Sequence, residues 1–120
     1  MTDPRRILVV DDNVSLRENI AECLQEEGFQ VILAGDGARA LESLAAEPLP
    51  AVAIIDLMMP RMSGAELVAR IRSEPRLAGL RVILSTGMSP LRDAVAADAV
   101  LVKPYGASAL IGAVRGLLEA

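Results

Sequence analysis

Five polar residues that directly follow short apolar runs could together bind and accept a phosphoryl group. They are Asp11 and Asp12 after residues 7–10, Asp56 after 52–55, Thr86 after 81–85 and Lys103 after 99–102. Three carboxylates held close together repel one another, and a shared hard divalent cation such as Mg²⁺ relieves that repulsion. An ammonium and a hydroxyl would add a charge and a hydrogen bond for a phosphoryl group. Asp56 is then a candidate nucleophile, because a carboxylate can form an acyl phosphate.

Each of these residues also has a simpler interpretation when it is considered alone. Asp11 and Asp12 could cap a helix, and Asp56 could be an ordinary turn residue. Thr86 could be a loop hydroxyl, and Lys103 a solvated charge. The prediction of a site therefore depends on all five lying at the same edge of one sheet.

Alternating elements would bring them to that edge. Apolar runs predict strands at 7–10, 29–34, 52–55, 81–85 and 99–102. Helical spacing predicts helices from 14 to 27, from about 37 to Pro48 with Leu41, Leu44 and Ala45 on one side, from Gly64 to 73–75, and from about 107. Such alternation indicates a parallel sheet with helices on both faces, in which all strands end at one edge. We expect one (βα)5 domain over residues 1–120, with no linker and no output domain.

Composition limits the possible functions. The chain has 120 residues, 52% of them hydrophobic, and a net charge of −4 without a dense basic patch. Binding to nucleic acid or to an anionic membrane is therefore disfavoured. No apolar run approaches the ~20 residues of a membrane span, and the lone Cys23 suits a reducing compartment, so we expect a cytoplasmic protein. The absence of histidine excludes His-based metal sites and general bases.

The ordered set of motifs resembles the receiver domains of response regulators in two-component signalling, over essentially the whole chain. It comprises Asp11-Asp12, Asp56-Leu57-Met58-Met59-Pro60 with Gly64, Thr86-Gly87 and Lys103-Pro104-Tyr105. The resemblance implies a flavodoxin-like sheet of strand order 2-1-3-4-5.

The resemblance also implies roles for the site residues. Asp56 would be the phosphoacceptor, and Asp12, Asp56 and the backbone carbonyl of Met58 would hold Mg²⁺ or Mn²⁺, with Asp11 assisting through water. Lys103 would pair with the phosphoryl group, and Thr86 would move toward it. The donor would be a histidine kinase or a histidine phosphotransfer protein, and the chain would be a signalling domain and not an enzyme. It would be either a stand-alone regulator or the receiver of a hybrid histidine kinase.

Two features depart from the family pattern. Val100 stands where many receivers carry a switch aromatic, so coupling through a moving ring is not expected. Only sixteen residues separate Thr86 from Lys103, which leaves 91–97 for a short or mobile fourth helix. We expect Tyr105 to be a packing residue.

Apolar side chains flank the proposed site. Met58 and Met88 each follow a site residue by two positions, and Pro104 follows Lys103. We hypothesise that the two methionines shield an acyl phosphate from water. Ordinary packing is the alternative.

Three other functions are possible. A degenerate receiver would act as a phosphorylation-independent interaction module. A phosphatase of the haloacid-dehalogenase type would need an acid two residues after the nucleophile, where Met58 stands. A flavin carrier would want a hydroxyl- and glycine-rich loop in place of Asp11-Asp12-Asn13.

Overall fold

Strands and helices alternate along the chain in the computed structural model, which describes residues 2–87 and 96–119. The strands are β1 (Thr2–Val10), β2 (Gln30–Ala34), β3 (Leu49–Asp56), β4 (Arg81–Thr86) and β5 (Ala99–Val102). The helices are α1 (Val14–Glu26), α2 (Gly37–Leu44), α3 (Gly64–Ser73) and α4 (Ala107–Glu119). All nine elements were expected from the sequence.

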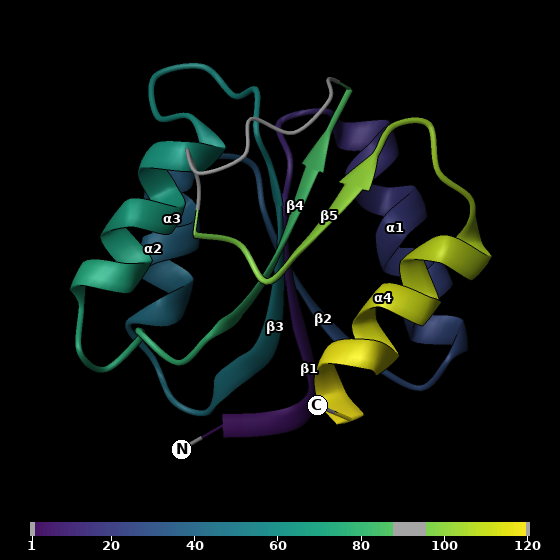
Figure 1. The fold of residues 1–120 in the computed structure, drawn as a ribbon, viewed down its shortest axis with the longest axis horizontal. Helices are drawn as coiled ribbons and strands as arrows, with labels where there is room; N and C mark the ends of the chain where they lie inside the picture. The colour runs from purple at the N-terminus through teal and green to yellow at the C-terminus, as the bar shows by residue number, and fades with distance from the viewer. Residues whose placement is uncertain (1, 88–95, 120) are drawn as a thin grey trace.

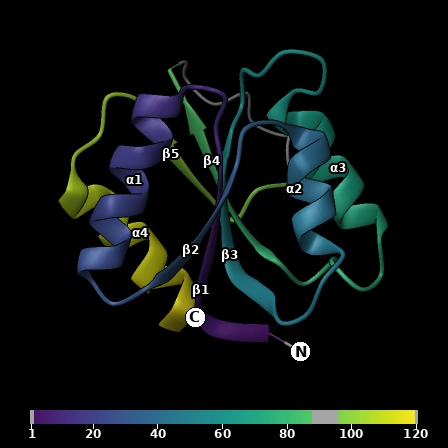
Figure 2. The same cartoon turned by 180° about the vertical axis from the view of Figure 1, so that it is seen from behind.

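The five strands form one parallel sheet in the order β2-β1-β3-β4-β5. Helices α1 and α4 cover one face of this sheet, and α2 and α3 cover the other (Figures 1 and 2). The predicted flavodoxin-like order is therefore confirmed. The helix expected over 91–97 falls largely on residues outside those that the structure describes, so its length stays a prediction.

Each central strand contributes side chains to two separate hydrophobic cores, because successive side chains point to opposite faces of the sheet. In β1, Leu8 and Val10 pack on the side of α2 and α3, whereas Ile7 and Val9 pack on the side of α1 and α4. All four are essentially inaccessible to solvent. This explains the continuous apolar runs: strands covered on both faces have no solvent side.

Three helices begin with a side chain that accepts a hydrogen bond from the first turn. Asn13, Asp36 and Ser63 accept from the backbone N–H groups of Leu16, Arg39 and Glu66 at 3.0, 2.8 and 3.2 Å. Such caps satisfy donors that have no partner within the helix. They fix where α1, α2 and α3 start, next to the strand ends.

Some boundaries differ from those expected. β3 begins at Leu49 and runs through Pro50, because an N-terminal extension of β1 pairs with it at Thr2 and Asp3. In α2, Ala40 is buried, whereas Ala45 lies just beyond the helix and is exposed. Among the described residues, no helix is long and apolar enough to cross a membrane.

Candidate phosphoryl and metal site

Three carboxylates meet at the carboxyl edge of the sheet, as the sequence predicted. Asp11 and Asp12 follow β1, and Asp56 is the last residue of β3. One carboxylate oxygen from each residue lies within 4.8 Å of the others. Asp11 and Asp56 are buried, whereas Asp12 is exposed. The cluster is thus open to solvent on the side of Asp12.

Lys103 brings a positive charge to this cluster. Its Nζ lies 3.2 Å from Oδ1 of Asp56 and 3.6 Å from Oδ2 of Asp11. The adjacent strands explain the approach, because the Lys103 N–H donates to the Thr86 carbonyl and extends the pairing of β5 with β4. The backbone N–H of Met58 also donates to Oδ1 of Asp56, at 3.4 Å.

Burial and neighbouring charges shift the pKa values of Asp56 and Lys103. Burial raises the pKa of Asp56, and the neighbouring charge of Asp11 raises it further, against the opposing effect of Lys103. Burial alone would lower the pKa of Lys103, but the hydrogen bond to Asp56 and the charges of both carboxylates outweigh it. The pKa of Lys103 is therefore raised, and its ammonium form is favoured.

The described residues fit a hard divalent cation. Oδ2 of Asp11 is buried, and within the described part of the chain it has no hydrogen-bond partner. A buried carboxylate oxygen without a donor is costly, and a cation with oxygen ligands would satisfy it. The donor set of three carboxylates therefore suits Mg²⁺ or Mn²⁺ on chemical grounds.

Gly64 allows the loop after β3 to close tightly against the strand. A Cβ at this position would lie 2.3 Å from the carbonyl oxygen of Asp56 and 2.8 Å from Cα of Leu57. The Gly64 N–H donates to the Leu57 carbonyl at 2.8 Å. Only glycine fits at such a distance, so the start of α3 is held directly behind the phosphoacceptor candidate.

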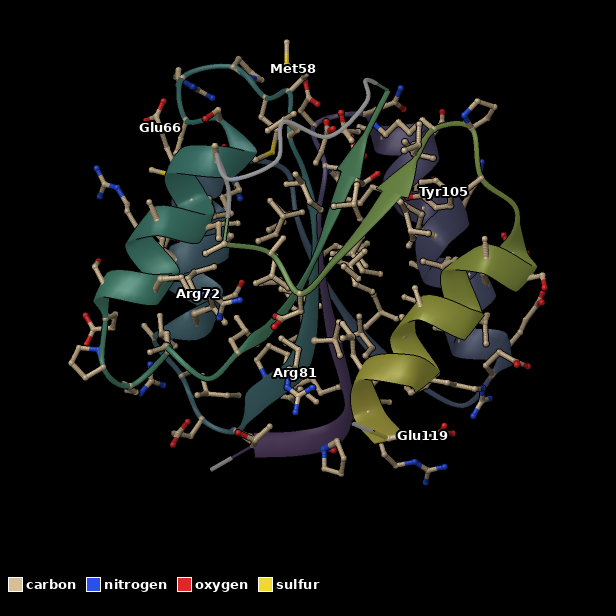
Figure 3. The ribbon with its side chains drawn as sticks, viewed as in Figure 1. Met58, Glu66, Arg72, Arg81, Tyr105 and Glu119 are labelled. Carbon is tan, nitrogen blue, oxygen red and sulfur yellow. The ribbon has the colours of Figure 1, made fainter. Side chains whose placement is uncertain are left out.

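Three apolar residues were predicted to flank the site: Met58, Met88 and Pro104. The Met58 side chain is 65% exposed and points away from the body of the domain at the end of the sheet (Figure 3). Met88 lies outside the described residues. Pro104 follows Lys103 through a cis peptide bond. The hypothesis that methionines shield the site stays a prediction.

Thr86 and Ser85 are both buried at the end of β4. Ser85 pairs in register with Asp56, and its hydroxyl lies 3.1 Å from that of Tyr105. Tyr105 packs against the core shared with α1 and α4, as expected for a packing aromatic (Figure 3). Val100, on the edge strand β5, is 38% exposed and carries no ring.

Two residues near the site were missed in the sequence. Ser85 lies inside an apolar run and was interpreted only as part of a strand. Arg17 is four residues after the Asn13 cap, and its Nη1 donates to the Asp11 carbonyl at 2.9 Å. The helical spacing from the cap could have indicated that Arg17 faces the turn after β1.

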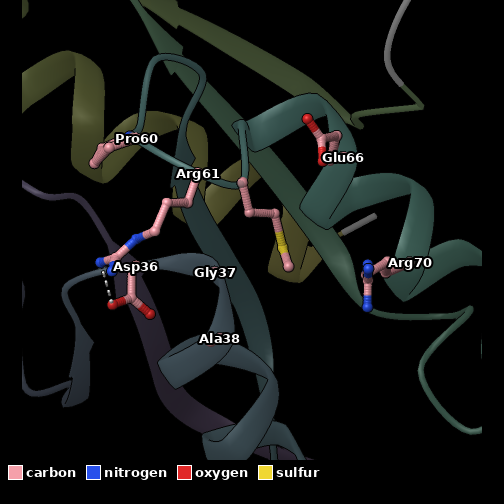
Figure 4. Close-up of a pocket in the computed structure, with 8 residues that line it drawn as sticks. Asp36, Gly37, Ala38, Pro60, Arg61, Glu66 and Arg70 are labelled. Carbon is pink, nitrogen blue, oxygen red and sulfur yellow. Dashed lines mark ion pairs between the residues drawn. The ribbon is translucent and has the colours of Figure 1, made fainter.

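A separate pocket of about 340 Å³ lies between the start of α2 and the loop before α3. It is lined by Asp36, Gly37, Ala38, Pro60, Arg61, Met62, Glu66 and Arg70. At its rim the Arg61 guanidinium lies 3.7 Å from Oδ2 of Asp36 (Figure 4). None of the three clustered carboxylates lines this pocket, so it is distinct from the acidic site.

Comparison with known proteins agrees with the fold. Residues 7–115 match the model of the response regulator receiver domain. The chain is 40% identical over 117 residues to the transcriptional regulatory protein PdtaR of Mycobacterium tuberculosis, covering 93% of this chain and 56% of that protein. It spans about half the length of the curated relatives that it matches.

Solved structures show the same fold. Chemotaxis protein CheY4 of Vibrio cholerae has a TM-score of 0.87 and 29% identity, covering 93% of this chain and 97% of that one. Response regulator protein TrrA of Thermotoga maritima, solved in complex with Mg²⁺-BeF, has a TM-score of 0.84 and 35% identity, covering 94% and 98%. The chain therefore belongs to the response regulator receiver domain family of two-component signalling.

Proposed function

We propose that this receiver domain accepts a phosphoryl group on Asp56 and that phosphorylation changes its binding to a protein partner. The observation that carries the proposal is the joint geometry of the acidic cluster and Lys103. One ammonium lies within 3.6 Å of two buried carboxylates, and a third carboxylate opens the cluster to solvent. This arrangement supports phosphoryl transfer better than it supports a purely structural role.

In the proposed reaction, a carboxylate oxygen of Asp56 attacks the phosphorus of a phosphohistidine donor. The P–O bond to Asp56 forms as the P–N bond to the donor imidazole breaks, and the imidazole leaves with the bonding electron pair. Lys103 would then move its ion pair from the Asp56 carboxylate to a phosphoryl oxygen. The Met58 N–H and the Thr86 hydroxyl are the candidate hydrogen-bond donors to the transferred group.

Asp11, Asp12 and Asp56, together with the backbone carbonyl of Met58, would hold Mg²⁺ or Mn²⁺. When bound, the cation would neutralise negative charge on the phosphoryl oxygens. The protein would be a signalling domain and not an enzyme, taking part only in its own phosphorylation and dephosphorylation.

We further propose a histidine kinase or a histidine phosphotransfer protein as the donor, in the cytoplasm. The surface from β4 to α4 would be the part that changes on phosphorylation, starting from Thr86. The chain would act either as a stand-alone regulator or as the receiver of a hybrid histidine kinase, with no direct contact to nucleic acid or membrane.

Incubation with Mg²⁺ and acetyl phosphate tests the proposal through the intact mass of the protein. We expect a gain of about 80 Da, the mass of one phosphoryl group, that is absent in Asp56→Asn and without Mg²⁺. Asp3→Asn, which removes one partly buried carboxylate at the far end of the sheet, is the matched control and should gain mass normally. A wild-type protein that gains no mass would instead support the degenerate receiver, a phosphorylation-independent interaction module.

A further inference from the structure

Asp11 is held by its neighbours at every polar atom but one. Its N–H donates to the Ala34 carbonyl at 3.1 Å, and its Oδ1 accepts from the Asn13 N–H at 2.9 Å. Its carbonyl accepts from Nη1 of Arg17 at 2.9 Å. Oδ2, which lies 3.6 Å from Nζ of Lys103, is the atom left facing the acidic cluster.

The Arg17 side chain reaches Asp11 through a tight space. A Cβ at Gly35 would lie 2.9 Å from Nη1 of Arg17 and 3.8 Å from Cζ. Any side chain at position 35 would therefore force the guanidinium to shift. Gly35, which follows β2, leaves room for the Arg17 guanidinium that donates to the Asp11 carbonyl in the turn after β1.

The position of the Arg17 side chain carries a free-energy cost, which the hydrogen bond to Asp11 helps to offset. Nε of Arg17 is buried and makes no hydrogen bond to any residue that the structure describes. A buried donor without a partner is unfavourable. An arginine that only stabilised α1 could avoid this cost by extending into solvent, so the contact with Asp11 calls for another explanation.

We propose that Arg17 is a positioning residue for the acidic site, which fixes the Asp11 backbone so that Oδ2 faces the cation. This inference rests on the proposed function. Positioning and simple electrostatics predict opposite effects. A positive charge near the cluster would by itself repel Mg²⁺, and its removal would tighten binding. Loss of a group that orients a metal ligand weakens binding.

The test measures the affinity for Mg²⁺ in Arg17→Gln, Arg17→Lys and Gly35→Ala by isothermal titration calorimetry. We expect the affinity for Mg²⁺ to fall about tenfold in Arg17→Gln, the lower end of the usual cost of losing a group that orients a metal ligand. The affinity of Arg17→Lys should fall less, because an ammonium can still donate to the Asp11 carbonyl. The affinity of Gly35→Ala should also fall, although this variant keeps the arginine and its charge.

Arg115→Gln is the matched control, since it removes the charge of an exposed arginine that pairs with Glu27 away from the acidic cluster. It should leave the affinity unchanged. Equal or tighter Mg²⁺ binding in Arg17→Gln would overturn the inference. If Arg17→Gln fails to fold, the Mg²⁺ affinity of Gly35→Ala is the deciding measurement. A wild-type affinity in Gly35→Ala would overturn the inference. Mass gain by the wild-type protein tests the proposed function separately, so the two can fail independently.

Discussion

Nζ of Lys103 lies 3.2 Å from Oδ1 of Asp56, although Asp56 ends β3, Lys103 follows β5 and β4 lies between these two strands. In the unphosphorylated protein this ammonium partly offsets the repulsion among the carboxylates. After phosphorylation the same ammonium could pair with the phosphoryl group. Its removal should therefore affect cation binding and phosphorylation in opposite directions.

Replacing Lys103 with Ala should slow phosphorylation by acetyl phosphate about 100-fold, because a charge that stabilises the transferring group is lost. The same variant should bind Mg²⁺ more tightly, since a competing cation is gone. The rate of mass gain and calorimetric titration measure the two effects. Slower phosphorylation together with weaker Mg²⁺ binding would instead indicate that the site as a whole had been disrupted.

Asp56→Asn should stabilise the metal-free protein at neutral pH, because it removes a buried charge that faces Asp11. The pKa of Asp56 is raised in the folded state, so the folded protein holds this proton more tightly than the unfolded chain does. The stability from the protonated form is complete below about pH 4, the ordinary carboxyl pKa, and is lost as pH rises through the folded pKa.

The stability advantage of Asp56→Asn should therefore grow as the pH rises above about 4, the ordinary carboxyl pKa. Urea unfolding in EDTA, followed by circular dichroism, measures it. Saturating Mg²⁺ should reverse the order, because the cation stabilises the wild-type site. A difference that does not depend on pH would contradict this account.

Gly64→Ala should destabilise the domain by about 1–3 kcal/mol, the usual cost of forcing extra atoms into a packed site. The new methyl group would meet the Asp56 carbonyl oxygen and Cα of Leu57, so phosphorylation should also become slower. Gly79→Ala is the control, because a Cβ there meets nothing within 4 Å. Urea unfolding of both variants tests this, and similar losses would argue against the close contact at Gly64.

Ser85→Ala should raise the pKa of Tyr105 further. Burial raises this pKa above its usual value, and the hydrogen bond with Ser85 opposes that rise. Because Tyr105 is the only tyrosine and the chain has no tryptophan, its ionisation can be followed by ultraviolet absorbance. Ser108→Ala is a control on the exposed start of α4. An unchanged titration in Ser85→Ala would mean that the two hydroxyls do not interact in solution.

Met58→Asn should shorten the lifetime of the phosphorylated protein, because an amide can orient an attacking water and a thioether cannot. Met58→Leu, which keeps the site apolar, is the control. Loss of the added mass after removal of acetyl phosphate measures both lifetimes. Equal lifetimes for Met58→Asn and the wild type would refute the shielding hypothesis.

Most of the fold was predictable because the apolar runs are short and separated by clear stop residues. Strands buried on both faces and amphipathic helices leave distinct patterns, and the parallel order brings every strand end to one edge. Asp11, Asp56 and Lys103 were found because each directly follows a short apolar run. The prediction that these residues lie close together required only the strand topology, because parallel strands all end at one edge of the sheet.

The contacts that the sequence did not reveal depend on register and on close approach. Nothing in the composition indicates that Ser85 pairs opposite Asp56, or that Gly35 leaves room for Arg17. The start of β3 was placed too late, at residue 52, whereas pairing with the N-terminal part of β1 extends the strand back to Leu49. Such features arise from tertiary packing and not from local propensity.

Both ends of the described chain, near Thr2 and Glu119, lie at the rim of the sheet opposite to the loops that carry the acidic residues (Figure 1). A tag or surface attachment at either end would therefore leave the open side of the acidic cluster, at Asp12, accessible from solution. Biosensor measurements on tethered protein should report the same partner affinities whichever end is immobilised.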